Sequence, residues 1–307
     1  MKLLIAEDDT GSRLVLAATL RKLGHDVTAV ANGLQAWEAW QKDDYPLLIS
    51  DWMMPELDGQ ALFRKIRAEH RARYTYLILL TSLGGKGSYL DGMDAGADDF
   101  ITKPFDEELL AARLHVAERI LALHEVLRVQ ATHDRLTGLL NRGATLDFLQ
   151  QELERSSREG SCVGVIMVDL DHFKQVNDIH GHLIGDAVLQ EAARRMQAVM
   201  RSYDRIGRYG GEEFLILSPG CNADHARTVA ERIRGCMTAT PIQTSAGELI
   251  VTASLGVAIS RKGAMHDADT LIASADAALY RAKHAGRNRV EMADPEAPVQ
   301  GHKAGSS

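Results

Sequence analysis

From residue 3 to residue 102, short apolar runs alternate with amphipathic stretches, and this alternation restricts the possible folds more than any other feature of the chain. The apolar runs cover residues 3–6, 27–30, 47–50, 76–80 and 99–102. The stretches with helical spacing between them cover residues 13–23, 34–41 and 59–70. Buried strands that alternate with helices form a parallel sheet covered on both faces. The sequence therefore predicts an α/β domain with a doubly wound five-stranded parallel sheet, in which ligands bind at the carboxyl ends of the strands.

Polar and charged side chains directly follow four of these predicted strands. They are Glu7, Asp8 and Asp9 after the first strand, Asp51 after the third, Thr81 after the fourth and Lys103 after the fifth. Carboxylates that meet at one sheet edge repel each other unless a cation lies among them, and oxygen ligands favour Mg²⁺. Each residue alone would more often be a solvated loop residue. Together, on four strand ends, they indicate a site for a transferable phosphoryl group.

These motifs resemble the receiver domain of two-component response regulators over residues 1 to about 125. The matching motifs are Glu7-Asp8-Asp9, Asp51-x-x-Met54-Pro55-x-x-Asp58-Gly59, Thr81 and Lys103-Pro104. The resemblance implies that Asp51 is the phosphoacceptor, that Lys103 pairs with the phosphoryl oxygens and that a histidine kinase is the cognate partner. It also implies a cis peptide bond before Pro104, although only about 5% of X-Pro bonds are cis.

The resemblance assigns further roles around the phosphoacceptor. Asp8 and Asp9 would bind Mg²⁺ together with Asp51. Thr81 would move towards the phosphate, and Phe100 would swing inward as it does so. Phe100 can also be interpreted as a simple core residue, because a strand phenylalanine usually is one.

A long helix is predicted from the N-cap Asp106 to about Thr132, because neither Gly nor Pro occurs between Pro104 and Gly138. One apolar stripe, suited to packing on the first domain, consists of Leu110, Leu114, Ala117 and Leu121. A second stripe, with the alternating spacing of a dimeric coiled coil, consists of Val116, Ile120, Leu123 and Leu127. Two heptads leave open the alternative that both stripes are core within one chain. A continuous helix would pass a rearrangement of the first domain to whatever follows it.

The second half of the chain has a different element order, which predicts an α+β domain over residues 133–292. Strands are expected at 163–170, 205–209, 214–218 and 251–259. Helices are expected at 144–158, 186–200, 224–237 and 267–285, with further helical residues after the first strand. The strands at 205–209 and 214–218 form an antiparallel hairpin, so this architecture differs from that of the first half.

Two acidic positions stand out in this second half. Asp169 lies near the end of a very apolar strand, and Glu212 and Glu213 follow the pair Gly210-Gly211 at the hairpin tip. Paired glycines allow a tight turn and a close approach of a nucleotide to the backbone. Carboxylates that converge there would bind Mg²⁺ and activate an attacking hydroxyl. Candidates for the phosphate side, each more often a surface charge when taken alone, are Lys174, Lys283 and Arg287.

The run from Arg208 to Phe214 resembles the GGDEF motif of diguanylate cyclases, in its variant with Glu at the third position. The supporting motifs are Asp134-x-Leu136-Thr137-Gly138-Leu139-x-Asn141-Arg142, Asp169-x-Asp171-x-Phe173-Lys174-x-x-Asn177-Asp178, His180-Gly181-His182-x-x-Gly185-Asp186 and Ala282-Lys283-x-x-Gly286-Arg287-Asn288. The resemblance covers about residues 132–292. It implies a mostly antiparallel, nucleotidyl cyclase-like fold that condenses two GTP into cyclic di-GMP and two pyrophosphates.

Carried over residue by residue, this resemblance implies three groups of ligands. Asp169 and Glu212 would bind Mg²⁺, and Glu213 would be a further ligand or the base for the 3′-hydroxyl. The triphosphate would contact Lys174, Lys283, Arg287 and the backbone amides near Phe173. Asn177 and Asp186 would bind guanine, because a carboxylate accepts from guanine N1–H and the 2-amino group, whereas adenine has no donor at N1. Asp186 is also a candidate N-cap of the helix that follows it.

A symmetric product requires two protomers that face each other, so the resemblance implies a homodimer whose geometry is set by phosphorylation through the joining helix. Arg201-x-x-Asp204, upstream of the hairpin, resembles the product-inhibition motif of the family, at which cyclic di-GMP binds. An ion pair at a helix end is the alternative interpretation. Arg155 and Arg232 align with it as secondary contacts to the product.

Charge, cysteine content and the length of the apolar runs disfavour several other classes of protein. With 35 Lys+Arg against 42 Asp+Glu, the net charge of −7 disfavours a DNA partner, and no basic helix-turn-helix of a transcriptional regulator follows the receiver-like region. Three cysteines without a CxxC, and no apolar run of membrane-spanning length, predict a soluble cytoplasmic protein with no membrane partner. The tail 293–307 is expected to be disordered. A catalytically silent receptor of cyclic di-GMP is a further alternative, which would need Arg201 and Asp204 but not the hairpin acids.

Overall fold

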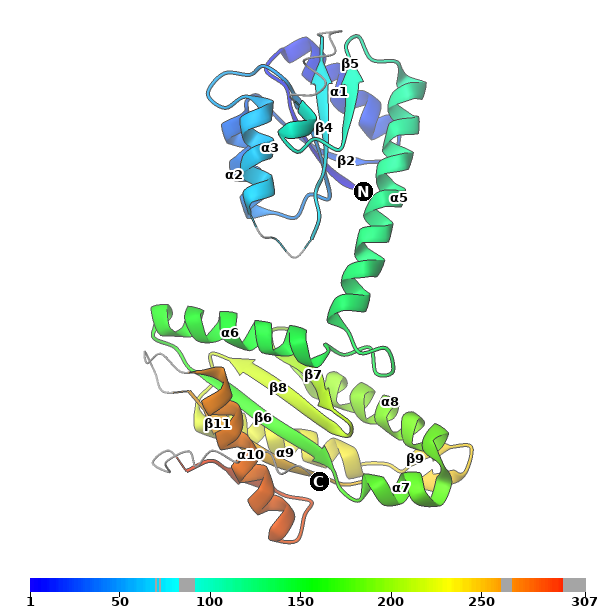
Figure 1. Cartoon of the computed structure of the whole chain (residues 1–307), viewed down its shortest axis with the longest axis vertical. Helices are drawn as coiled ribbons and strands as arrows, with labels where there is room; N and C mark the ends of the chain where they lie inside the picture. Colours follow the sequence, from blue (N-terminus) through cyan, green and yellow to red (C-terminus); the bar gives the residue numbers. More distant parts are fainter. Residues whose placement is uncertain (70, 72, 83–91, 261–266, 295–307) are drawn as a thin grey trace. The chain divides into compact units, whose positions relative to one another are not determined.

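The computed structural model describes residues 1–69, 71, 73–82, 92–260 and 267–294, and Figure 1 traces its helices and strands. The chain divides into two compact units, Met1–Val129 and Gln130–Ser307, each with its own sheet. Within the described ranges, no helix is long and apolar enough to cross a lipid bilayer. From residue 295 onward, the tail expected to be disordered lies outside the described residues.

The first unit is built on one five-stranded sheet. Its strands are β1 (Lys2–Ala6), β2 (Asp26–Val30), β3 (Leu47–Asp51), β4 (Tyr76–Thr81) and β5 (Asp99–Thr102). They lie in the order β2-β1-β3-β4-β5, and every neighbouring pair is parallel. Each residue of β4 is buried, as expected for a central strand covered on both faces. The predicted doubly wound sheet is confirmed.

Helices cover both faces of this sheet and begin at polar caps. The helices are α1 (Thr10–Lys22), α2 (Gly33–Lys42) and α3 (Gly59–Ala68), with Asp9, Asn32 and Asp58 as N-caps. One core lies between the sheet and helices α1 and α5, and the other between the sheet and α2 and α3. At Gly59 a Cβ would lie 2.2 Å from the backbone oxygen of Asp51, so only glycine lets α3 approach this strand end so closely.

Helix α5 (Glu107–Thr132) begins as predicted, because Asp106 Oδ1 accepts a hydrogen bond from Leu109 N at 3.0 Å. On its first stripe, Leu110, Leu114 and Ala117 are buried in the core of the first unit. The ring of His124, further along α5, stacks on Tyr74 with 4.1 Å between ring centroids.

The second stripe of α5 is largely exposed. Val116 is 45% exposed, Leu123 63% and Leu127 61%, whereas Ile120 is partly buried against the core. Leu123 and Leu127 are therefore not part of the core of the first unit, and the coiled-coil role of this stripe stays a prediction.

The second unit is built on a mixed sheet. Its strands are β6 (Val163–Leu170), β7 (Arg205–Gly210), β8 (Glu213–Pro219), β11 (Ala253–Ile259) and β12 (Val290–Met292), in the order β12-β11-β6-β8-β7. Three pairs are antiparallel and the β11–β12 pair is parallel, so the sheet is mostly antiparallel as predicted. Strand β12 and the separate hairpin of β9 (Ile242–Thr244) and β10 (Gly247–Leu249) were not predicted.

The described residues of this unit also form the helices α6 (Arg142–Glu159), α7 (Phe173–His180), α8 (His182–Val199), α9 (Ala223–Thr238) and α10 (Ala268–His284). Helices α8 and α9 contribute to the core on one face of the sheet, and α6 and α10 to the core on the other. Because α8 starts at His182 with Gly181 as its N-cap, Asp186 lies inside the helix. The interpretation of Asp186 as an N-cap is therefore wrong.

Candidate functional site

The first unit gathers three carboxylates where β1 and β3 end. One oxygen from each of Glu7, Asp8 and Asp51 lies within 4.8 Å of the others. Glu7 is buried, Asp51 is half-buried and Asp8 is exposed, so the cluster opens to solvent on one side. This donor set, which consists of oxygens alone, fits a hard divalent cation such as Mg²⁺.

Lys103 bridges two of these carboxylates. Its Nζ lies 2.6 Å from Glu7 Oε2 and 2.8 Å from Asp51 Oδ2. Burial opposes the charge of Lys103, but the hydrogen bonds to Asp51 and Glu7 raise its pKa overall. Burial also raises the pKa of Glu7, and the negative charge of Asp51 adds to this effect. The peptide bond from Lys103 to Pro104 is cis, as predicted.

The structure replaces Asp9 by Glu7 in this cluster. Asp9 Oδ1 accepts a hydrogen bond from Ser12 N at 2.7 Å and so caps α1, and this bond lowers the pKa of Asp9. The preference for Asp directly before a helix was the signal in the sequence that separates Asp9 from its two acidic neighbours. Glu7, which was named among the strand-end carboxylates but not assigned to Mg²⁺, lies in the cluster where the resemblance had placed Asp9.

The two predicted switch residues lie on neighbouring strands. Thr81 ends β4 and is 6% exposed, and Phe100 on β5 packs partly buried against the core on the α2–α3 side. Their movement on phosphorylation stays a prediction.

In the second unit, the hairpin of β7 and β8 lies beside the end of β6. Gly211 at its tip has a φ of 42°, a conformation that favours glycine. Glu213 is the register partner of Asp169 across the β6–β8 pair, and Leu170 N donates to Glu212 O at 3.4 Å. The predicted convergence of Asp169 with the hairpin glutamates is therefore present in the backbone.

The electrostatics of these acids depend on burial and on one lysine. Asp169 is 7% exposed, and its Oδ2 lies 2.7 Å from Lys283 Nζ. Burial raises the pKa of Asp169, and Lys283 opposes this effect. Burial also raises the pKa of Glu213, and the charge of Asp169 adds to it. Among the described residues, the oxygens of Asp169, Glu212 and Glu213 do not reach the mutual 4.8 Å spacing found in the first unit.

An ion pair connects the β7–β8 hairpin to Asp134, near the start of the second unit. Arg208 Nη1 lies 3.2 Å from Asp134 Oδ2, and Arg208 Nε donates to Gly211 O at 2.8 Å. Asp134 also accepts hydrogen bonds from the backbone and the hydroxyl of Thr137. Burial opposes the charge of Asp134, but the bonds from Thr137 and Arg208 lower its pKa overall. Sequence reasoning quoted both Asp134 and Arg208 in motifs without a role.

Arg208→Ala is expected to lower the free energy of unfolding of the second unit by about 1–3 kcal/mol at pH 7, because two charge-assisted bonds are lost. The folded-state pKa of Asp134 is lowered, so its contribution to stability is present above its unfolded pKa of about 3.9. This contribution is lost as the pH falls through the folded-state value, so parent and variant should converge in acid. Urea unfolding across pH measures both effects, with the exposed Arg158→Ala as a control. An equal loss of stability in both variants would contradict the prediction.

The residues predicted to bind guanine lie on α7 and α8. A Cβ at Gly185 would lie 1.9 Å from Asn177 Oδ1, so glycine lets Asn177 lie against the residue that precedes Asp186. Both Asn177 and Asp186 are half-buried. The side chain of Phe173 is in the core, which leaves only its backbone for a nucleotide.

The residues predicted to bind the triphosphate come from two regions. Lys174 is exposed on α7, and Lys283 near the end of α10 pairs with Asp169. Arg287 is exposed in the turn between α10 and β12, with a φ of 63°.

The predicted inhibitory motif forms a turn before β7. Asp204 Oδ2 accepts from Arg201 N at 3.1 Å, whereas the guanidinium of Arg201 donates to the Tyr203 hydroxyl. The ion pair considered as an alternative is therefore not formed. Asp204 is 5% exposed, and within the described part of the chain its Oδ1 has no hydrogen-bond partner. Arg155 on α6 pairs with Glu152, and Arg232 is exposed on α9.

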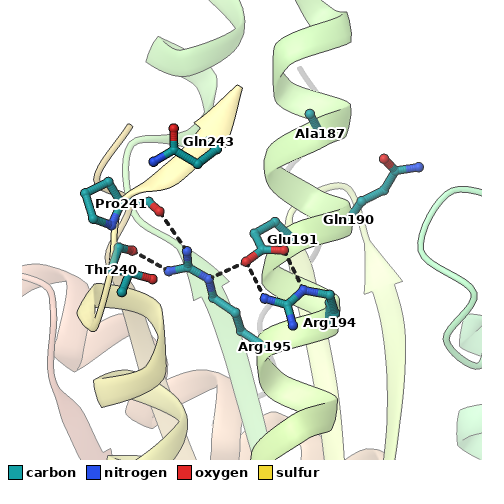
Figure 2. A pocket seen from close by; sticks show the side chains of 8 residues that line it. All are labelled: Ala187, Gln190, Glu191, Arg194, Arg195, Thr240, Pro241 and Gln243. Atoms are coloured by element: carbon teal, nitrogen blue, oxygen red, sulfur yellow. Dashed lines mark hydrogen bonds and ion pairs between the residues drawn. The ribbon is translucent and has the colours of Figure 1, made fainter. Parts of the chain in front are cut away.

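A hollow of about 710 Å³ lies between α8 and the segment after α9 (Figure 2). Its lining consists of Ala187, Gln190, Glu191, Arg194, Arg195, Thr240, Pro241 and Gln243, none of which is a predicted site residue. Arg195 is 7% exposed and donates to Glu191 and to the carbonyls of Met237, Thr240 and Pro241. Bonds from Arg194 and Arg195 lower the pKa of Glu191 to about 2. Arg195 therefore fixes the backbone of the segment that leads into β9.

Comparisons with known proteins agree with the two units. A family model described as the response regulator receiver domain matches residues 3–115, and one described as the diguanylate cyclase GGDEF domain matches residues 131–289. Response regulator PleD of Caulobacter vibrioides is 30% identical over 252 residues, which are 80% of this chain and 56% of PleD. Diguanylate cyclase DgcP of Pseudomonas aeruginosa is 40% identical over 166 residues, which are 54% of this chain and 24% of DgcP. The chain thus spans about half of PleD and a quarter of DgcP.

Two solved structures resemble the second half of the chain. The coiled coil and GGDEF domain of DgcB from Caulobacter crescentus, in complex with c-di-GMP, has a TM-score of 0.56 and 33% identity. The match covers 61% of this chain and 98% of that one. Diguanylate cyclase SiaD of Pseudomonas aeruginosa, in complex with its activator SiaC, has a TM-score of 0.53 and 40% identity, over 61% of this chain and 71% of that one.

Proposed function

The chain belongs to the GGDEF family and carries a response regulator receiver domain ahead of its GGDEF domain, and from this we propose that it is a diguanylate cyclase activated by phosphorylation. The reaction condenses two GTP into cyclic di-GMP and two pyrophosphates. The observation that carries the proposal is the register of β6 with β8, which brings the GGEEF hairpin acids beside Asp169 and its partner Lys283.

In each half-reaction, the 3′-oxygen of one GTP forms a bond to the α-phosphorus of the other, and the bond from that phosphorus to pyrophosphate breaks. Glu213, whose pKa is raised by burial and by Asp169, accepts the 3′-hydroxyl proton. Asp169 and Glu212 would hold Mg²⁺, which would neutralise the triphosphate and acidify the hydroxyl. The triphosphate is bound by Lys174, Lys283, Arg287 and the backbone at Phe173.

Guanine is selected by Asn177 and Asp186. Their helices pack closely at Gly185, which supports a shared role of the Asn177 amide and the Asp186 carboxylate in binding guanine. Adenine would leave the Asp186 carboxylate without a donor at N1, which disfavours ATP.

Catalysis requires a homodimer, because each protomer holds one GTP and the product contains both. The exposed stripe on α5, of which Leu123 and Leu127 are the most exposed members, supports a parallel coiled coil with a second copy. Misplacing the two nucleotides by about an ångström costs on the order of 100-fold in rate, so the register of α5 controls the reaction.

Control begins at the receiver, where a histidine kinase phosphorylates Asp51. Glu7 and Asp8 would hold Mg²⁺ together with Asp51, and Lys103 already contacts two of these acids. On phosphorylation, Thr81 at the end of β4 would move towards the phosphate, and Phe100 on β5 would swing inward. Helix α5 receives it, because Leu110 and Leu114 are part of the receiver core.

Cyclic di-GMP inhibits the enzyme at Arg201 and Asp204, with Arg155 and Arg232 as further contacts. Arg201 N donates to Asp204 Oδ2 at 3.1 Å, so the two motif residues lie in one turn, which supports a shared role in binding the product. Arg201→Ala is expected to raise the product concentration needed for half-inhibition by at least about tenfold, because the charged contact is lost. Initial rates against added cyclic di-GMP measure this effect. Unchanged inhibition would remove Arg201 from the inhibitory site.

The proposal is tested with the full chain, GTP and Mg²⁺, with and without beryllofluoride as a phosphoryl mimic. Cyclic di-GMP formation that rises with the mimic in the parent, but not in Asp51→Asn, is the expected result. Product that does not respond to the mimic would keep the cyclase and reject the control by the receiver. No product in either condition, with retained binding of cyclic di-GMP, would favour the silent receptor.

A further inference from the structure

The carboxylate of Asp171 is a buried ionisable group without a role in the proposed reaction. It lies directly after β6 and is 5% exposed. Its Oδ1 accepts from Ser254 Oγ at 2.6 Å, and its Oδ2 accepts from Thr252 Oγ1 at 2.6 Å and from the backbone N of Asn288 at 3.0 Å. Both oxygens are therefore occupied by donors, which distinguishes Asp171 from the nearby Asp169 that faces Lys283.

The turn that Asp171 contacts has a strained backbone. Gly286, Arg287 and Asn288 have φ values of 112°, 63° and 45° in succession. A left-handed conformation is unfavourable for Arg287, whereas asparagine tolerates it, so the bonds of the surrounding residues are needed to hold the turn at Arg287. One of these bonds is the hydrogen bond from Asn288 N to Asp171, and another runs from Arg234 Nη1 to Asn288 Oδ1 at 3.0 Å.

We infer that Asp171 is a positioning residue: it fixes the turn of residues 286–288 and thereby orients Arg287 towards the GTP triphosphate. The inference deepens the proposed function and rests on it for the identity of the nucleotide. Asp169 and Asp171 leave the same strand end, and both contact the chain around the end of α10: Asp169 pairs with Lys283, and Asp171 holds the turn that follows the helix. Nucleotide binding therefore depends on a carboxylate that does not touch the nucleotide.

Two substitutions separate this anchoring from general packing. Asp171→Ala removes the acceptor for Asn288 N. Asp171→Asn keeps a carbonyl oxygen for Thr252 and Asn288, and its amide can donate to the Ser254 hydroxyl, which is able to accept. Ser254→Ala is the matched control, because it removes a buried bond to the other carboxylate oxygen and leaves the turn bonded. Asp171→Ser, too short to reach Asn288, replaces the alanine variant if that variant does not fold.

The first measurement is amide hydrogen exchange at Asn288 in the full chain, which does not depend on any nucleotide. Exchange in Asp171→Ala is expected to accelerate at least about tenfold, because a bond to a charged acceptor is lost. Asp171→Asn and Ser254→Ala are expected to stay within about twofold of the parent. Unchanged exchange in Asp171→Ala, or equal acceleration in Ser254→Ala, would overturn the anchoring.

The second measurement is a double-mutant cycle on GTP turnover by the full chain. Asp171→Ala and Arg287→Ala are each expected to raise KM for GTP about tenfold with a smaller change in kcat, and Asp171→Asn to restore most of the loss. The KM of the double variant is expected to stay within about twofold of that of Arg287→Ala, because both substitutions remove the same contact between Arg287 and the triphosphate. If the increase in KM of the double variant equals the product of the two single increases, Asp171 acts independently of Arg287. A parent chain that forms no cyclic di-GMP would reject the link to GTP, and the exchange result would still decide whether Asp171 fixes the turn.

Discussion

Glu213→Gln is expected to lower the rate of cyclic di-GMP formation by about a thousandfold. A glutamine side chain keeps the shape of the glutamate but accepts no proton and binds cations weakly, and general-base catalysis alone contributes about 10²–10⁴ in rate. Glu213 is half-buried in register with Asp169, and the variant removes the repulsion by Asp169 that adds to the effect of burial on the pKa of Glu213. The folded state should therefore be no less stable than that of the parent.

The measurement is the initial rate at saturating GTP and Mg²⁺ with beryllofluoride present. Glu154→Gln, an exposed change on α6, is the matched control and should keep the parent rate. Thermal unfolding followed by circular dichroism checks that both variants are folded. A Glu213→Gln protein that keeps a tenth of the parent rate would exclude Glu213 as the base.

The double variant Leu123→Asp with Leu127→Asp is expected to lose the dimer and about 100-fold of the activity at low micromolar protein. Both side chains are more than 60% exposed in one chain, and burying each in a coiled coil stabilises the dimer by about 1–2 kcal/mol per protomer. Aspartates at these positions would instead place four negative charges in one seam.

Sedimentation velocity gives the oligomeric state, and the specific activity is measured on the same samples. Val129→Asp is the matched control, since Val129 is 41% exposed on the same helix but outside the stripe. It should leave both the dimer and the rate close to those of the parent. An active dimer of the double variant would place the interface elsewhere.

The inner strands β1, β3 and β4 of the receiver were predictable because parallel strands buried on both faces must be apolar. The bounds predicted for β5 and β6 are those that the structure shows. By contrast, β12 has three residues and exists only through its pairing with β11, and β9 and β10 pair only with each other. Such short strands have no periodic pattern of their own, because their hydrogen bonds come from tertiary contacts.

At the sites, motif order predicted which strand ends bring acids together, but not which acid of a run takes part. Asp9 and Glu7 lie in one acidic run, and only the start of α1 shows that Asp9 is a cap and Glu7 a member of the cluster. Asp171 lies two residues from Asp169 in the same motif, and its partners are far along the chain, at Thr252 and Asn288. Roles of this kind depend on the tertiary fold and leave no spacing that a single sequence can show.

The exposed stripe on α5 has a consequence for how the output depends on the amount of protein in a cell. If the active form is a pair of chains, its abundance rises with the square of protein concentration while pairs are scarce, and linearly once most chains are paired. A twofold change in expression then changes second-messenger synthesis by up to about fourfold. The Leu123–Leu127 seam would therefore make gene dosage a second input beside the kinase.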